Sequence, residues 1–373
     1  MKKCCSIFVA IIIVLTFLLS GCSEQQQVYE QIKGEEITLN YDSLESNSKV
    51  AIPDTLYAFV GEKITLYYLN LTYCNNLDDV KVTIDADGKG VSYTDRWEYV
   101  PAKKEKFDLV VTVSDVNGNV SEKKTCAIDV KDQSEKERLN VLLIGDSTIN
   151  NGTISKTVFD KALANNYSLS LLGTRGNNYA LHEGRSGWTA KMFVEREEDK
   201  EGFKNFFYNS ETNSFDFAYY MDLNSYKKVD CVVIQLGIND VFSCKTDEVL
   251  DYSMQQYMSY MSNIINSIKQ YDDNVKVVIN LILPCSVDES KFLEAYGGEQ
   301  TAGRCKQNSH TANLNIINNW GNKENEDIFI FYSNLTLDTN NNMDSGGNGG
   351  IHPSKSGYTQ IGEQLYSFLR AIN

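Results

Sequence analysis

The sequence is poor in positive charge, which excludes one class of function. It has 35 Lys and Arg residues against 50 Asp and Glu residues, and its formal net charge is −15. A protein that binds nucleic acid needs a basic face on its surface. We therefore exclude a nucleic-acid partner, and the excess of acidic residues otherwise indicates a well-solvated surface.

Residue patterns that bind metal ions are also scarce. The chain has three histidines, at positions 182, 310 and 352, and no Cys-x-x-Cys pair. Metal sites that can be read from a sequence usually show such a pair or closely spaced histidines. We predict neither a metal nor a cofactor.

The apolar run near the N-terminus is too short to span a bilayer comfortably. It extends from Ile7 to Leu19 after two lysines, which is the pattern of a signal peptide. It ends in Leu19-Ser-Gly-Cys22, which resembles the lipobox of bacterial lipoproteins. The resemblance implies a signal peptide over 1–22 and lipidation of Cys22, so that acyl chains anchor an extracytoplasmic protein to the cell membrane or cell surface. An ordinary secretory signal with an incidental cysteine is the alternative.

The next part of the chain shows the two-residue period of β-strands. After a polar tether over 23–34, strand-like runs and a turn at Asp115–Gly118 fill residues 35–132. They predict a small all-β sandwich domain, which resembles the immunoglobulin-like domains that precede catalytic domains in secreted carbohydrate esterases. A spacer role and a carbohydrate contact are both open for it. A charged linker then leads to a second domain over 138–373. The strand-like runs are 63–69, 80–84, 107–113 and 123–130.

Export would permit disulfides. Cys74 and Cys126 form the one cysteine pair of the N-terminal region and are a candidate bridge between two strands. Cys231 heads an apolar strand and is predicted to be buried and free. The pairing among Cys244, Cys285 and Cys305 stays open, because connectivity does not follow from sequence.

Strands alternate with helices in the second domain. This alternation predicts a parallel sheet with helices on both faces. We expect an α/β fold of flavodoxin-like type, with a five-stranded parallel sheet. The predicted strands are 140–144, 167–173, 230–236, 275–283 and 327–332, and the predicted helices are 153–164, 249–268 and 354–371.

The first of these strands carries the most informative residue. Val141-Leu-Leu-Ile144 has the composition of a strand buried on both faces, and Gly145-Asp-Ser-Thr148 follows it. A serine at the carboxyl end of such a strand lies where open α/β sheets bind ligands. Taken alone, Asp-Ser-Thr fits a helix N-cap better than a catalytic site.

Four segments together favour catalysis. Each follows a strand or enters a helix of the second domain. In this order they resemble the SGNH, or GDSL-type, hydrolase superfamily, and the resemblance covers residues 140–372. The second segment is also similar to that of members that deacetylate polysaccharides. The four segments are Gly145-Asp-Ser-Thr148, His182-Glu-Gly-Arg-Ser-Gly-Trp-Thr189, Gln235-Leu-Gly-Ile-Asn-Asp240 and Gly350-Ile-His-Pro-Ser354.

The resemblance implies a role for each matching residue. Ser147 would be the nucleophile and His352 its general base, because an imidazole can take the hydroxyl proton and later return it to the leaving alcohol. The oxyanion would be bound by the backbone N–H groups of Ser147 and Gly187 and by the amide of Asn239. Asp240 is expected to brace the Asn239 loop.

The other two histidines receive no catalytic role. His310 is expected to be solvated, and His182 either supports its loop or contacts substrate.

One position departs from the family pattern. The Asp that usually precedes the histidine by three residues is replaced by Gly349. Three groups remain as candidates to orient His352: Asp344, the side-chain oxygen of Asn348, or a backbone carbonyl. We favour a Ser–His dyad oriented by a carbonyl or by Asp344.

These observations predict a surface-anchored serine esterase that removes O-acetyl groups from a carbohydrate polymer. A non-catalytic carbohydrate-binding lipoprotein on a degenerate hydrolase fold and a polysaccharide O-acetyltransferase are the alternatives. The aromatic segments 204–209 and 215–220 either contact sugar or form a satellite core, and the core is favoured. Trp188 is a candidate wall for a small acyl pocket.

Overall fold

The computed structural model describes residues 50–73, 80–133, 137–344 and 350–373. The predicted signal peptide, the lipidation site Cys22 and the tether lie outside these residues. So do Cys74, Asn348 and Gly349. Within the described residues, no helix is long and apolar enough to cross a membrane.

The N-terminal region consists of two small sheets. One has the strand order β1-β7-β6-β3 and the other β2-β5-β4. The turn predicted at Asp115–Gly118 joins β6 to β7, and its Gly118 N–H donates to the Asp115 carbonyl. The pairing is antiparallel except that β1 runs parallel to β7. The elements are β1 (Thr55–Phe59), β2 (Ile64–Tyr67), α2 (Tyr68–Leu71), β3 (Val80–Asp85), β4 (Val91–Ser92), β5 (Arg96–Tyr99), β6 (Glu105–Asp115) and β7 (Val120–Lys131).

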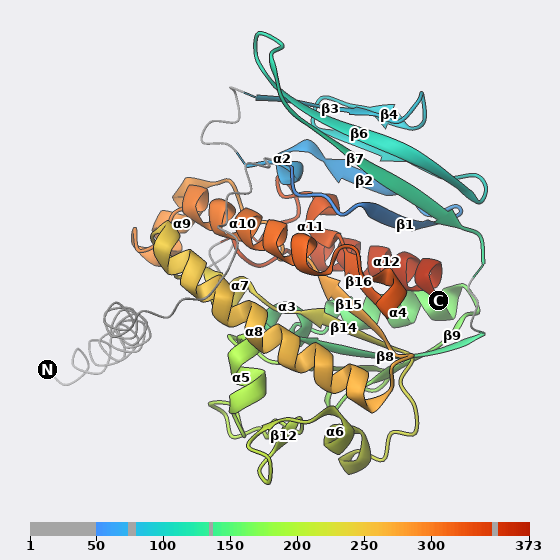
Figure 1. Ribbon diagram of the computed structural model, residues 1–373, viewed down its shortest axis with the longest axis vertical. Coiled ribbons are helices and arrows are strands. Elements are labelled where there is room, and N and C mark those ends of the chain that lie inside the picture. The colour runs from blue at the N-terminus through green and yellow to red at the C-terminus, as the bar shows by residue number, and fades with distance from the viewer. Residues whose placement is uncertain (1–49, 74–79, 134–136, 345–349) are drawn as a thin grey trace, which may run out of the picture.

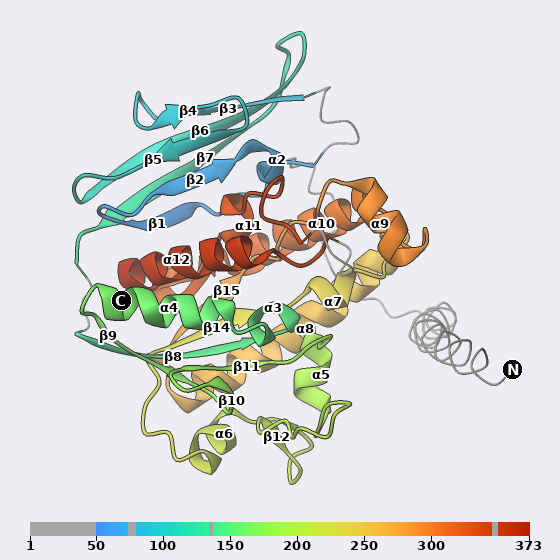
Figure 2. The same ribbon diagram turned by 180° about the vertical axis from the view of Figure 1, so that it is seen from behind.

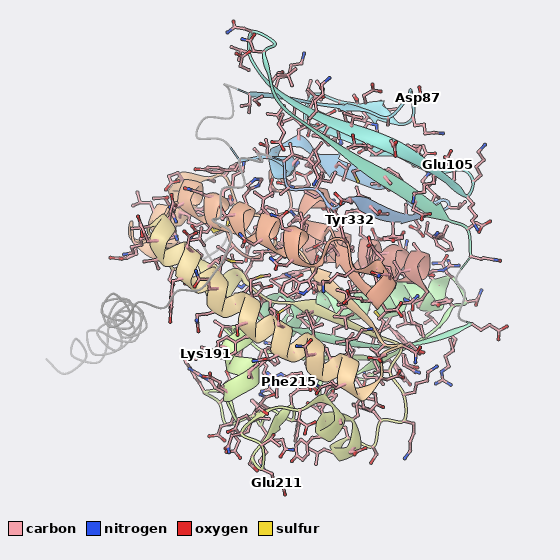
Figure 3. The ribbon with its side chains drawn as sticks, viewed as in Figure 1. Asp87, Glu105, Lys191, Glu211, Phe215 and Tyr332 are labelled. Carbon is pink, nitrogen blue, oxygen red and sulfur yellow. A yellow bond between two sulfur atoms is a disulfide. The ribbon has the colours of Figure 1, made fainter. Side chains whose placement is uncertain are left out.

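The two sheets are not separated from the rest of the chain by solvent. The ring of Tyr57 on β1 meets Phe329 and Phe368 edge to face, with centroids 5.6 and 6.1 Å apart. Tyr332, labelled in Figure 3, donates its hydroxyl to the Tyr57 carbonyl at 2.6 Å. One continuous group of buried apolar side chains therefore connects β1 with α12 (Lys355–Ile372).

An α/β region follows, and its mixed fold contains the predicted parallel pairing. Its strands are β8 (Arg138–Gly145), β9 (Ser168–Leu172), β10 (Arg175–Asn177), β11 (Ala180–Gly184), β12 (Tyr208–Asn209), β13 (Ser214–Phe215), β14 (Cys231–Gln235), β15 (Lys276–Asn280) and β16 (Ile328–Phe331). Its helices besides α12 are α3 (Ser147–Asn150), α4 (Thr153–Ala164), α5 (Ala190–Glu195), α6 (Phe217–Leu223), α7 (Ile238–Val241), α8 (Asp247–Tyr271), α9 (Glu289–Tyr296), α10 (Ala302–Trp320), the 3-10 helix η2 (Glu324–Glu326) and α11 (Ser333–Thr336).

The central sheet contains all five predicted strands in the parallel order β9-β8-β14-β15-β16. Two more strands make it larger than the five-stranded sheet expected. β9 pairs with the first part of β8, and β11 pairs with the last two residues of β8 on the same side. β10 pairs antiparallel with β11. The β10–β11 hairpin has no run of apolar residues, and the hydrophobic pattern therefore did not reveal it.

Helices cover both faces of this sheet. α8 and α10 lie in front of it in Figure 1, and α4 and α12 lie side by side on the opposite face in Figure 2. The long helix α8 begins where Thr246 accepts a hydrogen bond from the Val249 N–H, and it buries the apolar stripe predicted from its spacing. Parallel strands covered in this way direct all their carboxyl ends to one rim of the sheet.

The cysteines only partly match expectation. Cys231 is buried, as predicted, and takes part in no disulfide with another described cysteine. Cys126 is also buried and free, so the bridge between Cys74 and Cys126 was wrong. The one disulfide of the described residues joins Cys285 to Cys305, which connects the loop after β15 to the first turn of α10.

Candidate active site

Three of the four sequence segments come together because their strands are neighbours. β11, β8 and β14 lie next to one another in the sheet, and each segment starts at the end of one of these strands. The Asp146 N–H donates to the Gln235 carbonyl at 3.1 Å, and the Arg185 N–H donates to the Gly145 carbonyl at 2.8 Å. The hydrogen bonding of the sheet thus continues past the strand ends and fixes the three loops against one another.

Ser147 is the first residue of the short helix α3. Asp146 caps this helix, and one of its carboxylate oxygens accepts from the Thr148 N–H at 2.8 Å and from the Thr148 hydroxyl at 2.7 Å. The N-cap interpretation of Asp-Ser-Thr is therefore correct, and it is compatible with catalysis. The cap uses Asp146 and Thr148, while Ser147 stays partly exposed with its hydroxyl available. As the first N–H of a helix, the Ser147 amide has no partner within α3.

The structure brings Ser147 and His352 into contact across 205 positions of sequence. The Ser147 Oγ lies 2.8 Å from the His352 Nε2. His352 precedes Pro353, which forms an isolated bridge with Met343, and Ser354, which caps α12 by accepting from the Gly357 N–H at 3.3 Å. α12 packs along α4, the helix that follows α3. This packing positions His352, just before α12, next to Ser147.

Of the two other predicted donors of an oxyanion hole, Gly187 lies on the loop after β11 and Asn239 lies in the short helix α7, and these two segments are joined to each other. Gly187 has a φ of +75°, a conformation that favours glycine, and its Cα faces open space. The Asn239 amide donates to the Trp188 carbonyl at 3.0 Å. Asp240 accepts from the Ala190 N–H at 3.2 Å, so the expected brace exists and connects the two loops.

The Gly187 loop is also connected to the helix that carries the serine. Asn150, the last residue of α3, donates its amide N–H to the Ser186 hydroxyl at 3.0 Å. Ser147, Gly187 and Asn239 thus belong to one hydrogen-bonded framework.

Two carboxyl groups are buried beneath this framework. Burial raises the pKa of Asp146 to about 6, against an ordinary value of 3.8. Burial also raises the pKa of Asp240 well above its usual range, and the charge of Asp146 adds to that rise. Both side chains brace the loops through hydrogen bonds, and both resist ionisation.

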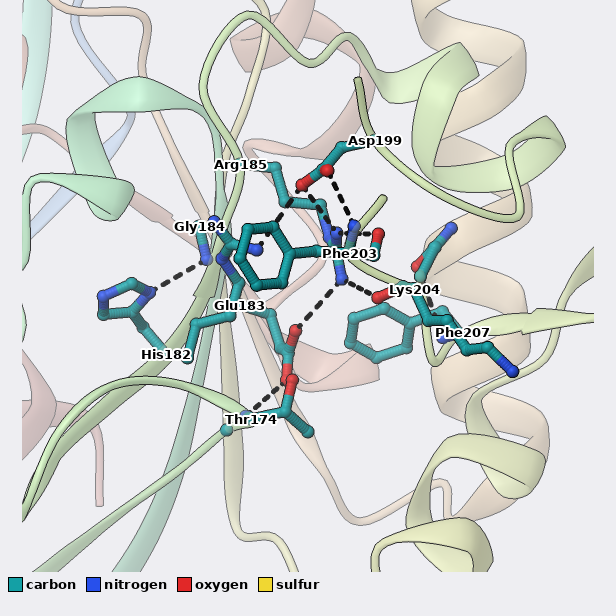
Figure 4. Close-up of polar contacts among 12 residues, drawn as sticks. Thr174, His182, Glu183, Gly184, Arg185, Asp199, Phe203, Lys204 and Phe207 are labelled. Carbon is teal, nitrogen blue, oxygen red and sulfur yellow. Dashed lines mark hydrogen bonds and ion pairs between the residues drawn. The ribbon is translucent and has the colours of Figure 1, made fainter. Parts of the chain in front are cut away.

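A charged cluster holds Arg185, which lies two residues before Gly187 (Figure 4). The Arg185 guanidinium, whose side chain is 1% exposed, lies 3.4 Å from Asp199 and 3.8 Å from Glu183. It also donates to the carbonyls of Phe203 and Lys204 and thereby holds the long insertion against the loop. This cluster was not predicted from the sequence, although Glu183-Gly-Arg185 in the second segment could have indicated a charge pair.

The orienting group of His352 stays a prediction. The Asp344 N–H donates to the His352 carbonyl at 2.9 Å, so the two residues are neighbours across a short backbone pairing. Asp344 therefore lies next to His352, which is necessary if Asp344 is to orient the imidazole.

The remaining histidines have structural surroundings. His182 is 2% exposed, its Nδ1 accepts from the Gly184 N–H at 3.1 Å, and burial lowers its pKa to about 4. It is therefore neutral and supports its own loop. The expectation that His310 is solvated was wrong, because it lies in the middle of α10, where burial lowers its pKa to about 4.

The long insertion between β9 and β14 forms the satellite core that was favoured. Four of its aromatic rings are buried and stack on one another; they are Phe207, Phe215, Phe217 and Tyr220. Trp188 is 3% exposed and packs edge to face on Phe193, so it belongs to the interior more than to an open pocket wall.

The family follows from a comparison with known sequences. The model of the family described as GDSL-like lipase/acylhydrolase matches residues 141–365, which include all four segments. The chain belongs to the GDSL-like lipase/acylhydrolase family. This GDSL-family protein is accordingly a carboxylic ester hydrolase, and the alternative of a non-catalytic binding protein is set aside. No curated protein sequence matches the chain.

Solved structures similar to this GDSL-family protein include carbohydrate esterases. A family 3 carbohydrate esterase from Talaromyces cellulolyticus is 18% identical, with a TM-score of 0.40, over 62% of this chain and 96% of that one. The Clostridium thermocellum family 3 carbohydrate esterase is 17% identical, with a TM-score of 0.40, over 61% and 94%. A carbohydrate acetylesterase from Sinorhizobium meliloti is 15% identical, with a TM-score of 0.38, over 63% and 100%. These are distant resemblances, and the family assignment depends on the sequence match.

Proposed function

We propose that the protein is a serine esterase that removes O-acetyl groups from a carbohydrate polymer. The observation that carries the proposal is the 2.8 Å contact between the Ser147 Oγ and the His352 Nε2 at the rim of the parallel sheet. A serine hydroxyl becomes a competent nucleophile when a neighbouring imidazole accepts its proton.

In the first half of the reaction, His352 takes the proton of Ser147 as the serine oxygen attacks the ester carbonyl. The resulting oxyanion accepts hydrogen bonds from the N–H groups of Ser147 and Gly187 and from the Asn239 amide. Such donors stabilise the tetrahedral intermediate because they are held in place before the charge develops. The intermediate then collapses, the bond to the sugar oxygen breaks, and His352 protonates that oxygen so that the sugar leaves as an alcohol while the acetyl group stays on Ser147.

In the second half, His352 takes a proton from water, which attacks the acetyl-serine. Acetate leaves, and the proton returns to the Ser147 oxygen. Asp240 and the Asn150–Ser186 contact hold the segments that carry the donors before a substrate binds.

A carbohydrate ester fits the polar surroundings of the nucleophile. Short polar side chains surround the serine on its own helix and on the two donor loops, namely Asn150, Ser186 and Asn239. These groups can both donate to and accept from sugar hydroxyls. A long acyl chain would instead need a continuous apolar wall.

Acetate release tests the proposal directly. The chain from Ser23 onward is assayed on p-nitrophenyl acetate and on acetylated xylan, beside Ser147→Ala and a control, Ser92→Ala, whose side chain is exposed in the N-terminal region. We expect release from both substrates that disappears in Ser147→Ala and persists in the control. Release that stays slow until an acceptor sugar is added would contradict hydrolysis and indicate an O-acetyltransferase.

The orienter of the histidine is tested by Asp344→Ala and Asp344→Asn. If Asp344 orients His352, both variants lower kcat with little change in KM, since an orienting carboxylate acts in the transition state. Unchanged turnover would rule out Asp344 and favour a backbone carbonyl.

We further propose that the enzyme is anchored outside the cytoplasm through lipid on Cys22. The support is the lipobox-like Leu19-Ser-Gly-Cys22. Globomycin, which inhibits the lipoprotein signal peptidase, should leave the full-length precursor in cells. Unaltered processing would overturn the proposal.

A further inference from the structure

A surface groove begins beside the active site and follows the edge of the sheet. It has a volume of about 740 Å³, and the elements that line it are α3, α4 and the β10–β11 hairpin (Figure 2). Ligand pockets typically have roughly 300–1,000 Å³. Asn150 lines the groove, and the same residue contacts Ser186 next to Gly187. The groove therefore starts within one helical turn of Ser147.

The far end of the groove carries a fixed aromatic surface. Tyr179 lies at the tip of the two-residue turn between β10 and β11 and is 71% exposed. Its ring stacks on Phe159 of α4, with centroids 5.3 Å apart and planes 11° from parallel. A tyrosine that is exposed and yet held by stacking offers one flat face to a ligand with little loss of rotamer entropy.

A second exposed ring lies in the same groove. Phe203 is 54% exposed, and the Arg175 guanidinium covers it at 5.0 Å from the ring centroid. Four asparagines also line the groove: Asn150 and Asn151 on the side of the active site, and Asn177 and Asn178 next to Tyr179. Flat rings beside amides suit a sugar, whose C–H face packs on an aromatic ring while its hydroxyls exchange hydrogen bonds with amides.

The charges of the groove are balanced. Lys156 is paired with Asp160, and Arg175 lies 3.5 Å from Asp199. Because each charged residue that lines the groove has an oppositely charged neighbour, the lining favours a neutral glycan.

The length of the groove sets the size of the ligand. Tyr179 precedes the first residue of β11, and Gly184 at the end of β11 adjoins the nucleophile loop. Five residues of strand at about 3.3 Å each place the ring about 17 Å from the catalytic rim. A sugar stacked on Tyr179 is therefore several units away from the sugar whose ester is cleaved.

We propose that this groove binds the chain of a neutral polysaccharide and that Tyr179 and Phe203 are its distal sugar-stacking residues. The inference rests on the proposed esterase function and adds its substrate class, an extended neutral glycan bound several units from the acetyl group.

Kinetics on substrates of increasing length test the groove. Acetylated xylo-oligosaccharides from the disaccharide to the hexasaccharide are compared with acetylated xylan. In the parent, kcat/KM should rise with chain length. Tyr179→Ala should lower the ratio of kcat/KM on xylan to kcat/KM on the disaccharide about tenfold, which corresponds to about 1.4 kcal/mol. Combining Tyr179→Ala with Phe203→Ala should lower this ratio further.

Tyr219→Ala is the matched control, because this tyrosine is 37% exposed on α6 and does not line the groove. It should leave the ratio unchanged. A ratio in Tyr179→Ala equal to that of the parent overturns the proposal.

A binding experiment separates failure of the groove from failure of the esterase. Affinity electrophoresis in gels that contain deacetylated xylan, glucomannan or polygalacturonate is run with Ser147→Ala, alone and combined with Tyr179→Ala. Retardation by a neutral polymer that Tyr179→Ala abolishes supports the groove even if the parent releases no acetate. Three results would overturn the groove, whatever the parent hydrolyses. They are no retardation in any gel, retardation that persists when Ser147→Ala is combined with Tyr179→Ala, and retardation by polygalacturonate alone.

Discussion

The burial of Asp146 predicts that one substitution beside the nucleophile stabilises the protein at neutral pH. The carboxyl group is fully buried, and burial raises its pKa from 3.8 to about 6. In the unfolded chain it ionises near its ordinary pKa. Asp146→Asn keeps an oxygen that can accept from Thr148 and removes the ionisable group.

The magnitude follows from the two pKa values. Below about pH 3.8 the group is protonated in both states and does not affect stability. As the pH rises toward 6, the unfolded chain loses the proton while the folded chain retains it, so stability falls, and above about pH 6 the loss is complete. A difference of roughly two pH units at about 1.4 kcal/mol each corresponds to about 3 kcal/mol.

Urea unfolding of the chain from Ser23 onward, at pH 4 and at pH 8, measures this difference. Asp146→Asn should match the parent near pH 4 and exceed its free energy of unfolding by about 3 kcal/mol at pH 8. Asp132→Asn, at an exposed position, controls for the loss of one negative charge. If the difference between Asp146→Asn and the parent is the same at both pH values, the reasoning about the buried carboxyl is refuted.

Three further predictions concern the donors and supports of the site. Asn239→Ala should lower kcat on p-nitrophenyl acetate about 10²–10³-fold with little change in KM, because one oxyanion donor is lost; an unchanged kcat would remove Asn239 from the oxyanion hole. Arg185→Met should lower the free energy of unfolding by about 3–5 kcal/mol in urea titrations, because it leaves the buried carboxylate of Glu183 without its partner. A change below about 1 kcal/mol would show that the cluster is not a support. Cys305→Ser should cost about 3 kcal/mol of unfolding free energy, since the disulfide closes a loop over a sequence separation of 20. Dithiothreitol should destabilise the parent by the same amount and leave the variant unchanged, and equal sensitivity of both proteins would contradict the assignment.

The sequence alone determined the elements that have a strong hydrophobic period. The helix expected over 153–164 is α4, and the apolar runs at 140–144 and 230–236 are the adjacent strands β8 and β14. Such patterns are local, because the period of the apolar residues reports which face of an element is buried. The four segments of the active site could likewise be recognised from the sequence, because their residue types and their order along the chain indicate a serine hydrolase.

Only the tertiary structure decided which of these residues meet. The contact of Ser147 with His352 depends on the packing of α12 against α4, and the pairing of Cys285 with Cys305 depends on where α10 lies. The buried ion pair of Arg185 and Asp199 links segments that no local pattern connects. Burial and proximity arise from contacts between distant parts of the chain, and a periodic pattern shows which face an element buries but not what covers that face.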